Sequence, residues 1–529
     1  MLVLILLSII LLIFIYLYFS SYTTLQYWKR KGIAHEEPSL FFGNLKGVAL
    51  KKICIRKRME ELCDKFKAHR YFGYYQFLTP SLVVMDADLL KQIFVKNFEY
   101  FSDHPDFFPK DADPFLKKTV FGREGEDWQD MRRILSPTFT RKKMKTMFAV
   151  MRKYSENFAD YYSNEKGTVT TVEMMNAYNR LVNDIIVTST LSIDCDSFKD
   201  QNNEFFVTGK QAFDFSGWKN IKFLGSSLNS TLMNLLGIKF FDTKVKKFYT
   251  QVVKDLTTYR EKHNVVQQDV LQLLLDARKG QVYDKETDEI DHITQTVAPE
   301  AEKASHYKNM LITDEDIAAQ IITYFFGSYD TVSITMSHMT YELVVNPDIQ
   351  NRLRNEIETA LKSCDGEMTY EVISNMKYLD MVVSETLRFW VPPFMLNRKC
   401  VKPFVVEPVL PHEKSFVIEP GTVIIIPASS IHKNPKYYKN PEKFDPERFS
   451  DENKGSINPY TYIPFGIGPR HCIGNRFGIL VVKTLMVSLL SRFEIVPVEK
   501  TVIPLEISKT EFVLRSDSGY WFGLKPLNT

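Results

Sequence analysis

The stretch Phe465-Gly466-Ile467-Gly468-Pro469-Arg470-His471-Cys472-Ile473-Gly474 decides the fold of this sequence. Its glycines Gly466 and Gly468 allow a tight turn with positive φ and a close approach of the backbone to a flat ligand. An apolar helical pattern follows from near Cys472 to about Arg492. The cysteine is therefore expected at a helix N-terminus, where the helix dipole and free backbone N–H groups stabilise a thiolate. A lone cysteine is usually a small buried hydrophobe, but this constellation predicts a thiolate ligand.

A thiolate in such a loop suits a haem iron. An anionic sulfur ligand pushes electron density onto the iron and favours cleavage of the oxygen–oxygen bond. Arg470, two residues before the cysteine, can then reach a haem propionate. Gly474, two residues after it, lets the helix lie close under the porphyrin. The loop thus predicts a haem site in which Cys472 is the sulfur ligand.

A second feature of the sequence is a helix of unusual length. Thr313 followed by Asp316 is typical of a capping box, and helical periodicity runs from there to Asn346, where Pro347 stops it. That is about 32 residues, against a usual mean of about 11–12, so the helix should cross the whole domain. Near its middle, an acid and a threonine stand side by side although both are poor helix formers. The threonine either bonds back to the preceding turn or has a functional role.

With these features in place, the sequence resembles the cytochrome P-450 family, in particular its microsomal members. The family motif Phe-x-x-Gly-x-Arg-x-Cys-x-Gly matches residues 465–474 at every fixed position. Four further family motifs occur in the right order, so the resemblance covers the chain from about residue 30. It implies a mainly α fold with minor β, in which haem b lies between the long central helix and the Cys-bearing helix. It also implies the residues that hold the cofactor: Cys472 on the iron, with Phe465, Gly466, Arg470 and Gly474 around it.

The pair Glu385 and Arg388 matches a second family motif. Spaced three residues apart, the two charges share one face of a helix. A surface ion pair is the commonest interpretation of such spacing. The resemblance implies instead that the pair is buried and locks to Arg448 in an irregular meander at 430–450. The role of all three residues would be structural.

Two more motifs are expected to hold the haem propionates. Trp128 and Arg132 lie four residues apart and therefore on one helical face. The resemblance implies that both bind a propionate. Arg398, after the Pro392-Pro393 turn, matches another propionate contact.

The stretch 327–331 of the long helix matches the oxygen-binding groove of the family. The resemblance implies that Asp330 and Thr331 form the catalytic pair, which holds O₂ and relays protons. The family usually has a second glycine where Ser328 stands, and threonine or serine where Val332 stands, so the groove is expected to be slightly narrower here. The substrate pocket is expected to be lined by Phe326, Ile322 and Gly327. The lid over it is expected in the segment 103–125, with Phe107, Phe108, Phe115 and Phe121.

The leader of the chain predicts a membrane anchor. Residues 1–19 carry no charge, and a helix of that length just spans a bilayer core of roughly 30 Å at about 1.5 Å per residue. A cleaved signal peptide is the alternative, but no basic region precedes the apolar run and no small-residue cleavage site follows it. The aromatic residues up to Trp28 and the charges of 29–31 place the rest of the chain on the cytosolic side. We therefore predict a transmembrane anchor at 1–20, a hinge at 21–45 and a catalytic domain at 46–529, on the endoplasmic reticulum membrane.

The composition is that of an ordinary globular protein. The net charge of +3 over 529 residues gives no argument for nucleic acid, and the six cysteines are scattered without paired spacing, which fits a reducing compartment. The segment 70–86 is expected to be a strand pair, and helices are expected near 347–361 and 376–390. The apolar stretch 222–241 is either a buried core helix or a second membrane contact.

The function that the resemblance implies is oxygen- and NADPH-dependent hydroxylation of lipophilic small molecules. Details of the stretch 96–140 resemble insect detoxifying members related to the vertebrate drug-metabolising branch. A solvated face is the ordinary interpretation of the basic run Arg141, Lys142, Lys143 and Lys145. The resemblance implies instead that it borders a docking surface for NADPH–cytochrome P-450 reductase, with cytochrome b5 as a second candidate donor. The alternatives are an isomerase that needs no reductase and a non-catalytic haem or lipid carrier. An intact Asp330-Thr331 pair argues against both.

Overall fold

The computed structural model describes residues 18–105, 113–163, 168–213, 241–280, 311–509 and 514–527. The predicted anchor lies almost wholly outside these ranges, as does the stretch 222–241 apart from Phe241. Phe107 and Phe108 of the expected lid also lie outside them. Within the described ranges, no helix is both long enough and apolar enough to cross a bilayer.

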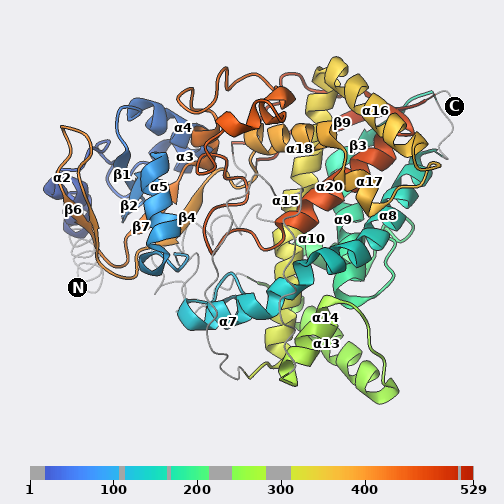
Figure 1. Ribbon diagram of the computed structural model, residues 1–529. Helices are drawn as coiled ribbons and strands as arrows, with labels where there is room; N and C mark the ends of the chain where they lie inside the picture. Colours follow the sequence, from blue (N-terminus) through green and yellow to red (C-terminus); the bar gives the residue numbers. More distant parts are fainter. Residues whose placement is uncertain are drawn as a thin grey trace, which may run out of the picture.

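Helices form most of the described molecule, and one long helix, α15 (Asp314–Val345), runs through it from end to end (Figure 1). The other helices are α2 (Tyr27–Lys31), α3 (Lys46–Ala49), α4 (Ile55–Lys65), α5 (Ala87–Lys91), α6 (Pro114–Lys118), α7 (Gly125–Leu135), α8 (Arg141–Ser163), α9 (Met174–Leu191), α10 (Glu204–Phe213), α13 (Thr243–His263), α14 (Val270–Arg278), α16 (Pro347–Lys362), α17 (Tyr370–Ser374), α18 (Lys377–Phe389), α19 (Ala428–His432) and α20 (Asn475–Leu490). Short helical turns are η1 (Gln92–Lys96), η2 (Phe98–Tyr100), η3 (Ser136–Phe139), η5 (Pro446–Phe449) and η6 (Lys454–Ser456).

The strands form small sheets at the two sides of the helical body (Figure 1). The largest has the order β1-β2-β7-β4, with β1 (Tyr71–Gln76), β2 (Thr79–Val84), β7 (Val423–Ile426) and β4 (Leu396–Lys399). The other two are β3-β9-β8, with β3 (Thr170–Glu173), β9 (Trp521–Pro526) and β8 (Phe493–Val496), and the pair β5 (Phe404–Val406) and β6 (Phe416–Ile418). The strand pair expected at 70–86 is confirmed, since β1 and β2 run antiparallel with Tyr71 opposite Val84.

The long helix begins and ends where the sequence predicted. The Thr313 side chain accepts from the Asp316 backbone N–H, and the Asp316 side chain accepts from the Thr313 N–H at 3.0 Å, which completes a capping box. At the other end, Asn346 follows the last helical residue and Pro347 opens α16. The helix contacts α9, α13, α18 and α20 and is buried on nearly every side, as expected for a helix that crosses a domain core.

The helices expected at 347–361 and 376–390 are present as α16 and α18. The helix expected from Cys472 is α20, but it begins at Asn475 and has Gly474 as its N-cap. Cys472 therefore lies in the loop before the helix, and the expectation of a Cys-bearing helix is corrected. Gly474, two residues after the cysteine, has φ −95° and lies directly before the first residue of α20.

A buried carboxylic acid sits near the end of the long helix. Glu342 Oε1 accepts the indole N–H of Trp390 at 2.7 Å, and Oε2 accepts from the Asn346 amide at 3.1 Å. Burial raises the pKa of Glu342 to about 7, and the charge of Glu385 adds to this, while the two hydrogen bonds lower it. No ion pair of Glu342 is found among the described residues, so its charged form is poorly compensated.

We expect Glu342→Gln to stabilise the protein at pH 8 and to change little at pH 5. An acid whose pKa is raised on folding keeps its proton to a higher pH in the folded state than in the unfolded state. Burying the charge of Glu342 therefore costs no free energy below the unfolded pKa of 4.5, and the cost is largest above the folded pKa of about 7. A shift of that size corresponds to about 3 kcal/mol, which is the upper limit of the gain because the amide must still satisfy Asn346. Urea unfolding at the two pH values measures the difference. The control is Glu358→Gln on α16, whose side chain is 45% exposed. An equal effect of Glu342→Gln at both pH values would contradict the prediction.

Candidate active site

Residues 465–474, here called the cysteine loop, form a tight turn that two glycines make possible. Gly466 has φ +79° and Gly468 has φ +74°, so both glycines have the positive φ that the sequence predicted. At Gly468 a Cβ atom would lie 1.9 Å from the Phe94 carbonyl oxygen, which no side chain can tolerate. The loop is closed by the Cys472 N–H, which donates to the Phe465 carbonyl at 2.8 Å. The backbone therefore fixes the position of the cysteine.

The environment of the Cys472 thiol differs from the expectation. The side chain of Cys472 keeps solvent-accessible surface. The surrounding protein nevertheless desolvates the thiol and raises its pKa. The Gly474 N–H and the Arg132 charge both lower this pKa, as predicted for a helix N-terminus, but burial outweighs them. A bound cation lowers the pKa of a thiol that ligates it.

Three arginines, Arg132, Arg398 and Arg470, converge beside the cysteine loop and are here called the arginine cluster. Arg470 donates to the Asp103 carboxylate at 3.3 Å and to the Arg123 carbonyl at 2.8 Å, and its guanidinium lies 4.2 Å from the Trp128 ring centroid. Arg398 donates to the carbonyl of Arg470 at 3.3 Å, and Arg132 is 3.4 Å from His471 Nδ1. The structure thus brings together four residues that the sequence assigned to propionate binding: these three arginines and Trp128.

Among the described residues, the acids around Arg398 and Arg470 do not offset the cost of burying the two guanidinium groups. Burial, then Arg470 and Arg132, lowers the pKa of Arg398 to about 9. Burial also lowers the pKa of Arg470 to about 10, although Asp103 and Glu124 oppose the shift. The Nε atoms of Arg398 and Arg470 are buried and have no hydrogen-bond partner among the described residues. Such a cluster fits a ligand that carries carboxylates.

The middle of α15 is the part of this helix that is open to solvent. Between Asp316 and Val344 only Gly327 and Thr331 are exposed, one turn apart, and the space beside Gly327 could take a Cβ atom without a contact below 4 Å. Phe326 and Ser328 are half-buried beside them. We call Phe326, Gly327, Ser328 and Thr331 the open stretch. Its position in an otherwise buried helix is what a ligand pocket would need.

The hydroxyls of the open stretch bond back to the helix. Thr331 Oγ1 donates to the Gly327 carbonyl at 2.6 Å, and Ser328 Oγ donates to the Tyr324 carbonyl. Asp330, the neighbour of Thr331, is largely buried and forms an ion pair with Arg515. The sequence left open whether Thr331 bonds back to the preceding turn, and the structure shows that it does. Its acid neighbour Asp330 is paired with Arg515.

Ile322 is 0% exposed and packs in the hydrophobic core. Phe115 is also buried and packs against Phe241 with ring centroids 5.8 Å apart. Phe121 fits the expectation, since its ring lies 6.5 Å from that of Phe326 and is stacked on His104.

The cysteine loop and the open stretch border the same region of the protein. The Phe139 ring stacks on Tyr324 of α15 at 5.6 Å and would lie 3.7 Å from a Cβ atom at Gly474. On the other side, a Cβ atom at Gly478 of α20 would lie 3.7 Å from Val332, next to Thr331. Contacts at both ends therefore fix the loop with respect to the middle of α15.

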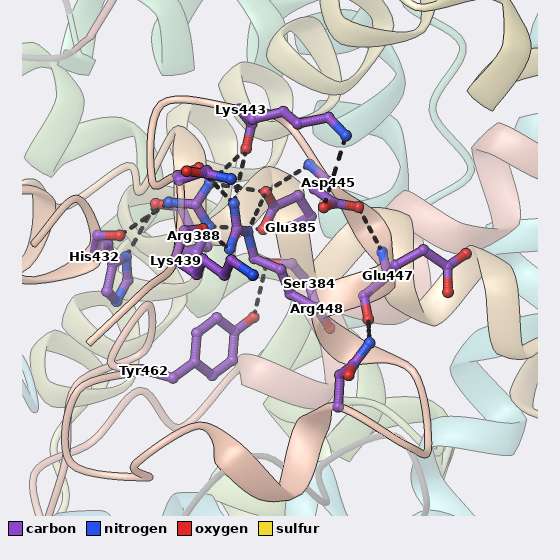
Figure 2. A network of polar contacts seen from close by, with 12 residues as sticks. Ser384, Glu385, Arg388, His432, Lys439, Lys443, Asp445, Glu447, Arg448 and Tyr462 are labelled. Atoms are coloured by element: carbon purple, nitrogen blue, oxygen red, sulfur yellow. Dashed lines mark hydrogen bonds and ion pairs between the residues drawn. The ribbon is translucent and has the colours of Figure 1, made fainter. Parts of the chain in front are cut away.

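A buried charge network supports the site from α18 (Figure 2). Arg388 forms two hydrogen bonds to the Glu385 carboxylate, at 2.7 and 2.8 Å, and both side chains are 0% exposed. Arg448 donates to Glu385 at 3.3 Å and to the Asn440 carbonyl at 2.6 Å. The surface interpretation of the pair is therefore wrong, and the buried triad that the resemblance implied is observed.

The same network reaches the residues before the cysteine loop. His432 Nδ1 lies 3.1 Å from the Arg388 carbonyl, and His432 Nε2 accepts the Ile463 N–H at 2.9 Å, so the proton of the ring is on Nδ1. Burial and the Arg388 charge lower the pKa of His432 to about 3, so the ring is neutral. Tyr462 also donates to the Ser384 carbonyl at 3.1 Å (Figure 2). Glu385 and Arg388 thus hold the chain that leads into the loop.

Sequence reasoning missed several residues of the site. Asp103 pairs with Arg470 over 367 positions of sequence, and Arg515 pairs with Asp330 over 185. Burial holds the pKa of His104 well below its usual value, and the charges of Arg398 and Arg470 lower it further. No local pattern marks such long-range partners.

Comparison with known proteins agrees with this geometry. A family model described as cytochrome P-450 matches residues 34–521. Cytochrome P-450 9e2 of Blattella germanica is 39% identical over 514 residues, which cover 94% of this chain and 93% of that protein. Probable cytochrome P-450 9f2 of Drosophila melanogaster is 35% identical over 512 residues, 95% of each chain. Cytochrome P-450 6k1 of Blattella germanica is 34% identical over 506 residues, 95% of this chain and 93% of that protein.

The chain belongs to the cytochrome P-450 family. It is a haem-thiolate monooxygenase with the mainly α fold of that family, and haem b is its cofactor. The residues present fit this group. The buried guanidinium groups of Arg398 and Arg470 suit the propionates, and the cysteine loop presents the Cys472 sulfur, which keeps solvent-accessible surface, as a ligand for the iron.

Proposed function

We propose that this protein hydroxylates lipophilic small molecules at a haem held by Cys472 and the arginine cluster. The observation that carries the proposal is the pair of buried arginines Arg398 and Arg470. The acids of the described residues do not offset the burial of their charges, which calls for an anionic ligand beside the cysteine loop. Trp128 and Arg132 of α7, Arg398 of β4 and Arg470 of the loop would hold the propionates. Phe465, Gly466 and Gly474 would shape the backbone around the sulfur. Haem bound there supplies the redox-active iron at which O₂ is activated.

The chemistry of the substrate follows from the side chains near the open stretch. Phe326 and Phe121 present aromatic faces, and Gly327 leaves space beside the helix. An apolar, aromatic lining with few polar groups favours lipophilic molecules.

Proton delivery is the task that we assign to Asp330 and Thr331. The Thr331 hydroxyl donates a hydrogen bond to the Gly327 carbonyl, and the lone pairs of Oγ1 can accept a hydrogen bond from a proton donor. By turning away from that carbonyl, the hydroxyl can pass its own proton on as Oγ1 takes up another from the donor. The adjacent Asp330 carboxylate would take up a proton from water and, as the carboxylic acid, be that donor. A positioned proton donor of this kind is worth roughly 10²–10⁴ in rate.

Electrons would come from NADPH–cytochrome P-450 reductase, with cytochrome b5 as a further donor. The basic run 141–145 begins α8 and follows η3, whose Phe139 borders the cysteine loop. Lys142 and Lys145 are exposed, although Lys145 also pairs with Glu371. A positive surface next to the loop would suit an acidic flavoprotein.

We further propose that the leader 1–19 anchors the enzyme in the endoplasmic reticulum membrane with the domain in the cytosol. Where the described chain begins, Tyr18, Phe19 and Tyr22 are exposed, and the charges 29–31 follow within α2. Exposed aromatic residues before a basic cluster are typical of a membrane interface.

We expect Thr331→Ala to uncouple the enzyme without weakening haem or substrate binding. The substitution removes the hydroxyl and adds no bulk, so substrate-induced spectral shifts should be unchanged. NADPH consumption should continue, with much of it diverted to hydrogen peroxide, and hydroxylated product per NADPH should fall by on the order of tenfold or more. The measurement is this ratio with added reductase.

Thr323→Ala is the matched control, because Thr323 makes the same back-bond, 2.6 Å to Ala319, two turns earlier. An unchanged ratio in Thr331→Ala would mean that protons reach the site by another route. The same assay separates the alternative functions. An isomerase would turn over substrate without NADPH, and a carrier would bind ligand and consume none.

A further inference from the structure

The acid of the proposed proton pair is held from a distant part of the chain. Arg515, in the segment between β8 and β9, donates through a terminal nitrogen to Asp330 Oδ1. The Asp330 side chain is 11% exposed and that of Arg515 is 29% exposed, so the pair is partly shielded from water. Charge pairs in such surroundings are stronger than those on an open surface.

The segment that carries Arg515 is fixed on α15 at several points. The Arg515 carbonyl accepts the Ser508 N–H at 2.7 Å, next to an antiparallel bridge between Ile507 and Ser516. Tyr520 lies 3.0 Å from His338 through its hydroxyl, and the Leu505 N–H donates to the Tyr341 hydroxyl at 3.0 Å. The three contacted positions of α15 are 330, 338 and 341, which fall within about 80° of one another around the helix at about 100° per residue. The segment therefore lies along one side of α15 and cannot easily move away from Asp330.

This arrangement constrains the direction of the Asp330 carboxylate. A guanidinium fixes the direction of the oxygens that it binds, because its donors form a rigid plane. Tyr329 lies in the same field, since Asp330 raises the pKa of its buried hydroxyl while Arg515 and Arg180 lower it, burial being the main cause of the raised value. The free movement of Asp330 toward solvent is thus restrained.

We propose that Arg515 is a positioning residue for proton delivery, which holds the Asp330 carboxylate oriented beside Thr331. This inference rests on the proposed role of the Asp330–Thr331 pair and names the residue that controls it. Arg515 touches neither the proposed haem ligands nor the arginine cluster in any contact of the described chain. It acts on the reaction only through Asp330.

The test is a double-mutant cycle on product formed per NADPH, with Arg515→Gln, Asp330→Asn and the combination of the two. We expect Arg515→Gln to lower the product formed per NADPH by on the order of tenfold. Misplacing a reacting group by about 1 Å can lower a rate by up to about 10², so the expected loss lies within that limit. The combined variant should be no worse than Asp330→Asn alone, because the arginine has no other route to the reaction. Arg515→Lys should restore part of the ratio. Arg492→Gln is the control, because it breaks a comparable but more exposed pair with Asp160.

The outcomes separate the two proposals. If Asp330→Asn couples like wild type, the proposed proton pair is wrong. If Asp330→Asn uncouples and Arg515→Gln does not, the pair stands and the role of Arg515 is wrong. Independent, additive losses in the combined variant would also overturn it. Arg515→Met is the second variant if Arg515→Gln does not retain haem. Urea unfolding of the wild type, the two single variants and the combined variant must also show an interaction energy between the two residues, a measurement that does not depend on activity.

Discussion

Arg388→Met should lose most of its bound haem and unfold at a much lower urea concentration than the wild type. The substitution leaves the Glu385 carboxylate 0% exposed and without its main partner. Burial already raises the pKa of Glu385, and Arg388 is the first of the groups that oppose this. Breaking a buried pair on one side costs roughly 3–5 kcal/mol, a large part of the roughly 5–15 kcal/mol that stabilises a typical domain.

The substitution should disturb the haem site as well as the stability of the whole protein. Arg388 also donates to the His432 carbonyl at 2.9 Å, and His432 holds the Ile463 N–H just before the cysteine loop. Haem content should therefore fall along with stability. The control is Lys67→Met, which removes a pair of the same spacing whose side chains are 74% and 77% exposed, and which should cost less than about 1 kcal/mol. A cost for Arg388→Met as small as that of the control would show that the network does not support the fold.

Cys472→Ser is the second change for which we expect a very large effect. Serine keeps the backbone bond from residue 472 to Phe465 and can accept the Gly474 N–H, so the cysteine loop should keep its shape. What disappears is the sulfur, and with it the electron-rich ligand that favours cleavage of the oxygen–oxygen bond. We expect monooxygenase activity to fall below detection while the protein remains folded.

Cys364→Ser provides the comparison, because Cys364 is half-buried in the turn between α16 and α17, and among the described residues its thiol lies near only the Ser363 hydroxyl as a hydrogen-bond partner. Its spectrum and activity should match those of the wild type. Activity in Cys472→Ser comparable to the wild type would show that another residue ligates the iron.

Features that depend on neighbouring residues could be predicted from the sequence. The capping box of Thr313 and Asp316 and the stop at Pro347 gave the bounds of α15, because capping depends on residues three or four positions apart. The positive φ of Gly466 and Gly468 followed from the same local logic. The buried triad around Glu385 required the resemblance, since three charges on a helix and a meander carry no sign of burial in themselves.

Features that depend on the surroundings of a residue could not be predicted in this way. Ile322 was expected at the pocket, but a helix that is buried on nearly every side has no apolar face that marks one direction. The pKa of Cys472 is raised because burial exceeds the effect of the Gly474 N–H, and only the packed structure gives that balance. The partners Asp103 and Arg515 come from segments that the fold brings together over long distances in sequence.

The spectrum of the reduced wild-type protein with carbon monoxide tests the assignment of Cys472 most directly. A thiolate opposite the carbon monoxide gives a strongly red-shifted Soret band, and we expect this band in the wild type and its loss in Cys472→Ser. A spectrum typical of a histidine ligand in the wild type would contradict the assignment of Cys472 as the ligand of the haem iron.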